Sequence, residues 1–156
     1  MGFFLVPRIS FAAEDKNQFI KAISLYKLLN YVGFEDGGVE PKFCFTSTDL
    51  FAAALKKINA QNREMTRFKG REISKYPECN IIYFDDGVNI NLKKYILENE
   101  RELLVSDRKG FVELYDGIIE LSEKKGKIGF IINLKKAKRV GIKISSKLIE
   151  SAQEIY

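Results

Sequence analysis

The segment Ile131–Ile149 reads IINLKKAKRVGIKISSKLI and carries the clearest structural signals in this chain of 156 residues. A short apolar run ends at Asn133, whose side chain can cap a basic helical turn. Gly141 can end that helix, because glycine readily adopts the left-handed conformation found after helix C-termini. Ser145 and Ser146 then offer an N-cap for an amphipathic helix. The segment therefore predicts a strand followed by two short helices.

Strand-like and helix-like segments alternate upstream of this stretch. An amphipathic stripe from Phe19 to Val32 predicts the first helix, with Lys21 on its solvated side. The strands expected next are 42–46, 65–68, 80–84 and 103–105, and the helices are 50–59 and 89–99. Residues 117–121 and 128–132 are expected to pair as a hairpin. This alternation predicts a layered α/β domain with a mainly parallel sheet.

The composition is that of one folded domain. Hydrophobic residues make up 46% of the chain, including 12 Phe and 7 Tyr, which is enough for a sizeable core. No run approaches the roughly 18 consecutive apolar residues that a membrane-spanning helix needs. The chain contains no His, which is the usual general base and the commonest metal ligand. We therefore predict no catalytic residues, no metal and no cofactor.

The net charge of +5 arises from 26 Lys and Arg against 21 Asp and Glu. Most basic residues are scattered among acidic ones, which is typical of a solvated surface. The acid-free stretch from Lys135 to Lys147 is the exception, and it could contact phosphates. No base-stacking motif or reading helix accompanies it, so the sequence predicts no nucleic-acid partner. A cytosolic adaptor that uses this basic surface is the least favoured class.

The N-terminal residues 1–13 read MGFFLVPRISFAA. Ser10 and Ala12 place small residues where a signal peptidase reads, and acidic residues follow Ala13, as at the end of a secretory signal. The front of the segment lacks a basic start, and Arg8 interrupts its apolar run. A truncated signal cleaved near Ala12 or Ala13 and a first strand of a cytosolic domain are both compatible with these residues.

Cys44 and Cys79 are the only cysteines. In a reducing compartment they would be two buried small hydrophobic residues, and in an oxidising one they would be expected to pair. They lie in or next to two predicted strands, which can be neighbours in an open α/β sheet. A bridge would close a loop of about 35 residues. By lowering the entropy of the unfolded chain it would stabilise the fold by roughly 4 kcal/mol.

Acidic and hydroxyl residues follow two of the predicted strands. Asp85 and Asp86 occupy a place where α/β proteins hold ligands or magnesium, but with Gly87 they equally form a turn. Ser106 and Asp107 could likewise hold a ligand or satisfy backbone amides at a turn. A nucleophilic serine would need a base, and His is absent. The sequence favours the structural interpretation of both pairs.

Three stretches together carry a family resemblance. They are AISLYKLLNYVGF at 22–34, LVSDRKGF at 104–111, and the run from Gly117 through the C-terminal segment quoted above. They resemble the YfiR-like family of small periplasmic regulators, and the resemblance covers Asn17 to Tyr156. The family's usual Trp is Phe34 in this chain and its usual Pro is Lys109, so the chain looks like a divergent member.

The resemblance implies a Rossmann-like, three-layer α/β domain at residues 14–156, with helices on both faces, behind a signal peptide at 1–13. It favours a Cys44–Cys79 disulfide and a periplasmic location. The implied function is non-enzymatic: the domain binds and restrains the extracytoplasmic part of a membrane signalling protein, a diguanylate cyclase or a sensor kinase. The alternative is a module that binds a small molecule or peptidoglycan fragment, and a homodimer is an alternative assembly.

Candidate contact residues also come from the resemblance and from their position at strand ends. Lys143 and Ser145 are the first choice for a ligand or partner surface, with Ser106, Asp107 and Phe111 beside them. Without a contact role, Lys143 would be a surface lysine and Ser145 a helix cap. The expectation is a single surface near the C-terminal end of the fold that combines both groups.

Overall fold

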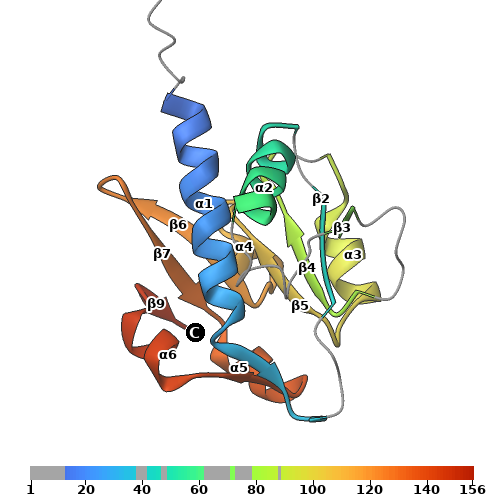
Figure 1. Ribbon diagram of the computed structural model, residues 1–156. Coiled ribbons are helices and arrows are strands. Elements are labelled where there is room, and N and C mark those ends of the chain that lie inside the picture. The colour runs from blue at the N-terminus through green and yellow to red at the C-terminus, as the bar shows by residue number, and fades with distance from the viewer. Residues whose placement is uncertain (1–12, 38–41, 47–48, 62–70, 73–78, 88) are drawn as a thin grey trace, which may run out of the picture.

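The computed structural model shows a central sheet with a smaller two-stranded sheet at one end (Figure 1). The structure describes residues 13–37, 42–46, 49–61, 71–72, 79–87 and 89–156. The helices are α1 (Ala13–Leu29), α2 (Asp49–Gln61), α3 (Leu92–Glu98), α4 (Phe111–Tyr115), α5 (Leu134–Arg139) and α6 (Ser146–Ser151). The strands are β1 (Val32–Phe34), β2 (Phe43–Thr46), β3 (Arg71–Glu72), β4 (Ile81–Phe84), β5 (Leu103–Ser106), β6 (Ile119–Lys124), β7 (Lys127–Ile132), β8 (Ile142–Ile144) and β9 (Glu154–Ile155).

The central sheet has the order β3-β2-β4-β5-β6-β7-β9, and the strands from β3 through β6 are parallel. β7 returns antiparallel to β6 and completes the hairpin that the sequence predicts. β9 pairs parallel with β7 at the edge of the sheet. The prediction of a mainly parallel sheet with a C-terminal hairpin is confirmed.

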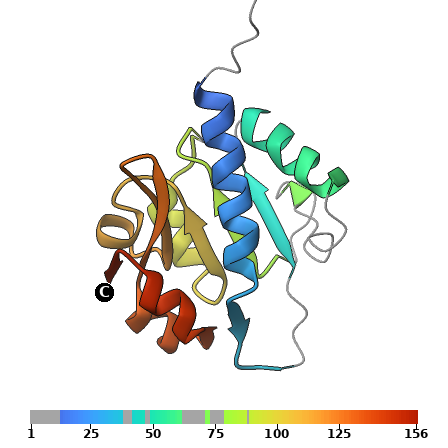
Figure 2. The same cartoon turned by 60° about the vertical axis from the view of Figure 1, so that its left-hand side comes forward.

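Side chains of the central strands alternate between two hydrophobic layers. Ile81 and Tyr83 of β4 pack with residues of α1 and α2, whereas Ile82 and Phe84 pack with residues of α3 and α4. All four residues of β4 are buried, as expected for a strand covered on both faces. Figure 2 shows α1 and α2 side by side over one face of the sheet. The predicted three-layer, Rossmann-like arrangement is therefore confirmed.

The two caps predicted in the C-terminal segment are present. The Asn133 side chain accepts a hydrogen bond from the Lys136 backbone N–H at 3.1 Å and begins α5. Ser145 accepts one from the Leu148 N–H at 3.3 Å and begins α6. Gly141 has φ = 80°, the left-handed conformation expected after α5. Local sequence signals thus fix both helix starts.

Several short elements differ from the sequence prediction. The first helix does not reach Val32: α1 ends at Leu29, and Val32 begins β1, which pairs antiparallel with β8. β8, β9 and α4 were not expected either. Each spans five residues or fewer and exists because a distant segment packs on it or pairs with it, which overrides weak local propensity. The strand expected at 65–68 lies outside the described residues, and β3 pairs with β2 at that edge.

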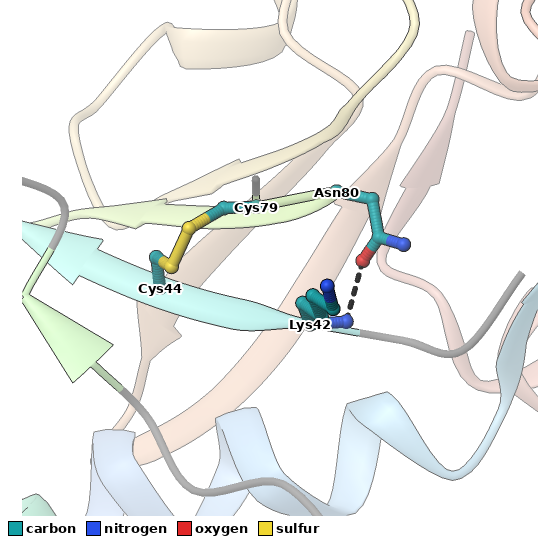
Figure 3. Close-up of a disulfide and its surroundings, with 4 residues drawn as sticks. All are labelled: Lys42, Cys44, Cys79 and Asn80. Atoms are coloured by element: carbon teal, nitrogen blue, oxygen red, sulfur yellow. Dashed lines mark hydrogen bonds between the residues drawn. A yellow bond between two sulfur atoms is a disulfide. The ribbon is translucent and has the colours of Figure 1, made fainter. Parts of the chain in front are cut away.

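The Cys44–Cys79 disulfide is formed, and its Cα atoms are 5.8 Å apart (Figure 3). It joins β2 to the residue preceding the turn into β4, on the face covered by α3 and α4. Beside it, the Lys42 backbone N–H donates to the Asn80 side-chain oxygen at 2.6 Å. The predicted bridge is confirmed, and it spans a sequence separation of 35 residues.

Candidate functional site

Ser106 closes the end of β5 against the end of β4. Its hydroxyl donates to the Phe84 carbonyl at 2.7 Å and accepts from the Arg108 backbone N–H at 3.0 Å. The residue is fully buried. Both hydrogen-bonding functions of this hydroxyl therefore serve the turn, as the structural interpretation of the sequence expected.

Asp107 ties the same turn to the first helix. One carboxylate oxygen lies 2.7 Å from the Lys21 Nζ, and the other accepts the Asp86 backbone N–H at 2.7 Å. The exposed fractions of the Asp107 and Lys21 side chains are only 3% and 16%. The prediction that Lys21 faces solvent is wrong, because the helix packs that side onto a carboxylate 86 residues away in the sequence.

Tyr83 lies on β4 next to this ion pair, with its ring stacked on Phe51 at a centroid distance of 4.6 Å. The residue is fully buried. Burial raises the pKa of Tyr83 well above its ordinary value, and the negative charges of Asp107 and Asp85 raise it further. The phenol is consequently neutral at all physiological pH values.

Phe111 and Glu120 fill the interior of the loop at the end of β5, residues 106–111, which is called the strand-end loop. The Glu120 carboxylate accepts the backbone N–H groups of Gly110 at 3.1 Å and Val112 at 3.2 Å, at the start of α4. Phe111 is fully buried and lies against Gly117, where an added Cβ would come within 2.2 Å of the ring. The Phe111 side chain is therefore part of the core, which corrects its prediction as a contact residue.

A second polar cluster gathers on Asp116, whose side chain is 62% exposed, and it fixes the start of α5. The Asp116 carboxylate accepts a hydrogen bond from the Asn133 side chain at 3.3 Å and pairs with the Lys136 Nζ at 3.3 Å. The Lys136 Nζ also donates to the Asp116 carbonyl. The Lys136 side chain is only 3% exposed, so this member of the basic stretch is internal. Arg139, at 3.6 Å from the same carboxylate, remains largely exposed.

Lys143 and Ser145 lie at the small β1–β8 sheet. Lys143 is exposed and stands opposite Gly33, and the Ser145 backbone N–H donates to the Tyr31 carbonyl at 2.9 Å. The alternate residues of both strands pack against the core. Strand alternation therefore directs Gly33 and Lys143 outward, and these two residues together with the flanking Tyr31 and Ser145 are called the outer face. Tyr31 is 40% exposed.

The two groups of predicted contact residues are not brought together. The strand-end loop meets α1 at Lys21, whereas the outer face follows the end of α1 at Leu29. Eight residues of helix separate these points, which is about 12 Å. The first group, Ser106, Asp107 and Phe111, is buried at the level of Lys21. The second group, Lys143 and Ser145, lies beyond the C-terminal end of α1.

Four participants in these clusters were missed by the sequence reasoning: Lys21, Asp116, Glu120 and Lys136. A signal existed for Glu120, because it interrupts the apolar run around Ile119 and Leu121, where an unpaired carboxylate would be costly. Lys21 and Lys136 gave no such signal, because a lysine on an amphipathic helix is ordinarily expected to face solvent.

Metal and membrane signatures are absent from the described part of the chain. Within residues 13–37, 42–46, 49–61, 71–72, 79–87 and 89–156, no group of three or more His, Cys, Asp or Glu side chains could hold a metal ion. In the same ranges, no helix is both long and apolar enough to cross a membrane.

The fold and these clusters define a class: a Rossmann-like α/β domain whose polar groups at the strand ends are used in internal bonds. Residues 18–153 match the YfiR/HmsC-like family, and the chain belongs to that family. No curated protein matches it significantly in sequence.

Among solved structures, the fold is similar to that of a conserved domain protein from Vibrio cholerae O1 biovar El Tor, with a TM-score of 0.56 and 13% sequence identity. The similarity covers 88% of this chain and 60% of that one, so this chain spans less than two thirds of its structural relative.

Proposed function

We propose that this chain is a non-enzymatic periplasmic regulator that binds and restrains the extracytoplasmic part of a membrane-bound diguanylate cyclase. The observation that carries this proposal is membership of the YfiR/HmsC-like family over residues 18–153. The internal use of Ser106, Asp107 and Glu120 supports it, because a hydrolase or transferase of this architecture would keep such groups available to a substrate.

The disulfide supports the proposed compartment. Bridges such as Cys44–Cys79 form and persist where the surroundings are oxidising, and they are rare in reducing cytosol. A domain that restrains a membrane protein from the periplasmic side would meet that condition.

The outer face is the proposed contact surface for the signalling partner. It combines an exposed cation at Lys143 with the half-exposed aromatic ring of Tyr31. Gly33 leaves open space between them, since a Cβ placed there would meet nothing within 4 Å. A regulator without catalysis acts by binding one state of its target more tightly than the other. An exposed aromatic ring is suited to that task, because tyrosine is enriched in protein interfaces, and the neighbouring charge can steer the approach of a partner.

The alternative function, binding of a small molecule or peptidoglycan fragment, was expected in a crevice between Asp107 and Lys143. The Asp107 side chain is nearly inaccessible and bound to Lys21 in the middle of α1, whereas Lys143 stands opposite Gly33, beyond the C-terminal end of that helix. The helix from Lys21 to Leu29 spans about 12 Å. No observation favours this alternative over partner binding.

The test uses cyclic-di-GMP in the cells that encode this chain. Deleting the gene should raise the intracellular level, and the exported wild-type protein should restore it. Protein carrying Lys143→Glu should fail to restore it, whereas Lys127→Glu, the same charge change on an exposed lysine of the β6–β7 hairpin, should succeed. An unchanged nucleotide level after deletion would contradict the proposed function. Equal rescue by both variants would move the contact surface away from Lys143.

A further inference from the structure

Three cations form one exposed side of α5. Lys135, Lys138 and Arg139 are spaced i, i+3 and i+4, so they share a helix face. All three are exposed, whereas Lys136 and Ala137 between them are buried. These three exposed residues are called the basic face. Lys143 is exposed on β8, which packs beside α5, and it adds a fourth charge at the same end.

Two carboxylates lie beside the cations of this region: Asp116 pairs with Arg139, and the Glu35 side chain lies next to Gly141, just after α5. The sequence contains no Asp or Glu from residue 133 to residue 149. Among the described residues, Lys135 and Lys138 form no ion pair. Asp116 is the carboxylate nearest to Arg139, and its charge is already shared with the buried Lys136 and with Asn133. The surface therefore presents a local excess of positive charge to any approaching partner.

Two exposed tyrosines border this charge. Tyr31 lies on the adjoining outer face. Tyr156 is 40% exposed; its carbonyl accepts the backbone N–H groups of Leu134 at 2.8 Å and Lys135 at 3.4 Å, and its hydroxyl donates to the Glu154 carboxylate at 3.2 Å. Tyrosine combines an apolar ring with a polar tip and is enriched where proteins meet the bilayer interface. Lysine, in contrast, is depleted in protein–protein interfaces relative to arginine.

We infer that the basic face binds the anionic phospholipid headgroups of the membrane beside which this regulator acts. Each Lys or Arg near an anionic bilayer is attracted to lipid phosphates without needing a shaped pocket, which suits a lysine-rich helix side. Both views of the fold show α5 at the same end as β1, opposite the N-terminal end of α1 (Figures 1 and 2). The bound membrane would therefore lie at the end that carries the outer face. This inference rests on the proposed periplasmic function at a membrane.

Vesicle co-sedimentation of the purified full chain, with its disulfide formed, tests the inference. Phosphatidylcholine vesicles should bind it weakly, and vesicles that also contain phosphatidylglycerol should bind it strongly. That binding should fall as salt is added, because salt screens surface charges. The double variant Lys135→Glu/Lys138→Glu should lower the partition coefficient by at least about 25-fold, since each lost cation contributes about five-fold.

The β6–β7 hairpin provides a matched control. Lys124 and Lys127 are exposed and form the last pair at the tip of the β6–β7 hairpin. This tip points away from α5 (Figure 1). Lys124→Glu/Lys127→Glu changes the net charge by the same amount and should lower the partition coefficient far less. Thermal unfolding of both variants checks the fold, and Lys135→Gln/Lys138→Gln replaces the first variant if it unfolds.

Three outcomes would overturn the inference. Equal binding to the two kinds of vesicle would show that anionic headgroups are not recognised. Equal loss of vesicle binding in the two double variants would show that the vesicles respond to the net charge of the protein and not to the basic face. Tighter binding to short duplex DNA than to phosphatidylglycerol vesicles at the same salt concentration would assign the face to nucleic acid. No partner protein is present in these assays, so their failure leaves the cyclic-di-GMP test, which depends on Lys143, unaffected.

Discussion

The loop Ser106–Phe111 and the outer face both carry residues of family-like motifs, but their side chains make contacts of opposite kinds. In the loop, Ser106, Asp107 and Phe111 are buried, and their polar atoms bond to β4, α1 and neighbouring turns. On the outer face, Lys143 is exposed and Ser145 caps a helix. A motif residue can therefore record how the chain folds rather than what it binds, and burial separates the two cases.

The largest effect is expected for Phe111→Ala in the buried loop. Removing a fully buried phenylalanine leaves a cavity between α4 and Gly117 and should lower the free energy of unfolding by about 4 kcal/mol. Urea unfolding measures the loss. Leu114→Ala on the same helix is the control: its side chain is 67% exposed, so this change should cost well under about 1 kcal/mol. Similar losses for both variants would show that α4 is not anchored by Phe111.

Asp107→Asn should have the next largest effect. The change removes the carboxylate charge that faces the nearly buried Lys21, and breaking a buried pair costs about 3 kcal/mol. Lys21→Met in the Asp107→Asn background should cost much less than Lys21→Met alone, because the pair is already broken. Additive losses in this double-mutant cycle would contradict the pairing. Asp86→Asn serves as the control, since Asp86 is 64% exposed.

Much of the fold could be predicted from the sequence because its signals are local. Asn133, Gly141 and Ser145 specify caps with their own side chains or backbone freedom, and the apolar run of β4 specifies a strand buried on both faces. β1 and β8 could not be predicted in the same way. Each is only three residues long, and antiparallel pairing with a strand more than a hundred residues away supplies its hydrogen bonds.

The candidate site was predictable only in part, for the same reason. The helix-capping role of Ser145 is a local property and was foreseen. The burial of Asp107 and Phe111 depends on Lys21 and Gly117, which reach them through the packing of α1 and the turn after α4. The amphipathic pattern of α1 predicts that Lys21 faces solvent. Such a pattern cannot reveal a single carboxylate partner on another element, so it misses the ion pair with Asp107.

Tyr83→Phe should change how the free energy of unfolding depends on alkaline pH. Its effect should lie between those of Asp107→Asn and Lys143→Glu. Because the folded-state pKa of Tyr83 is raised, the folded protein keeps this proton where the unfolded chain, with a pKa near 10, releases it. The contribution of Tyr83 to the free energy of unfolding is therefore largest below about pH 10. Above that pH it falls by about 1.4 kcal/mol per pH unit. Tyr83→Phe should remove that part of the slope in urea unfolding measured between about pH 9.5 and 11. An unchanged slope in Tyr83→Phe would contradict the prediction.

The smallest effect on stability is expected for Lys143→Glu, and it separates the two regions most cleanly. Lys143 is exposed and stands opposite Gly33, so the substitution removes no packing and should change the free energy of unfolding by no more than about 0.5 kcal/mol. The same variant should nevertheless fail to lower cyclic-di-GMP in cells, because an exposed charge affects the contact with the partner and not the fold. Urea unfolding of the purified variant measures its stability, and the cellular assay of the same variant measures its activity, with Lys127→Glu as the reference in both. A loss of stability comparable to that of Asp107→Asn would mean that Lys143 is a structural residue like those of the loop, and the contrast between the two regions would then be wrong.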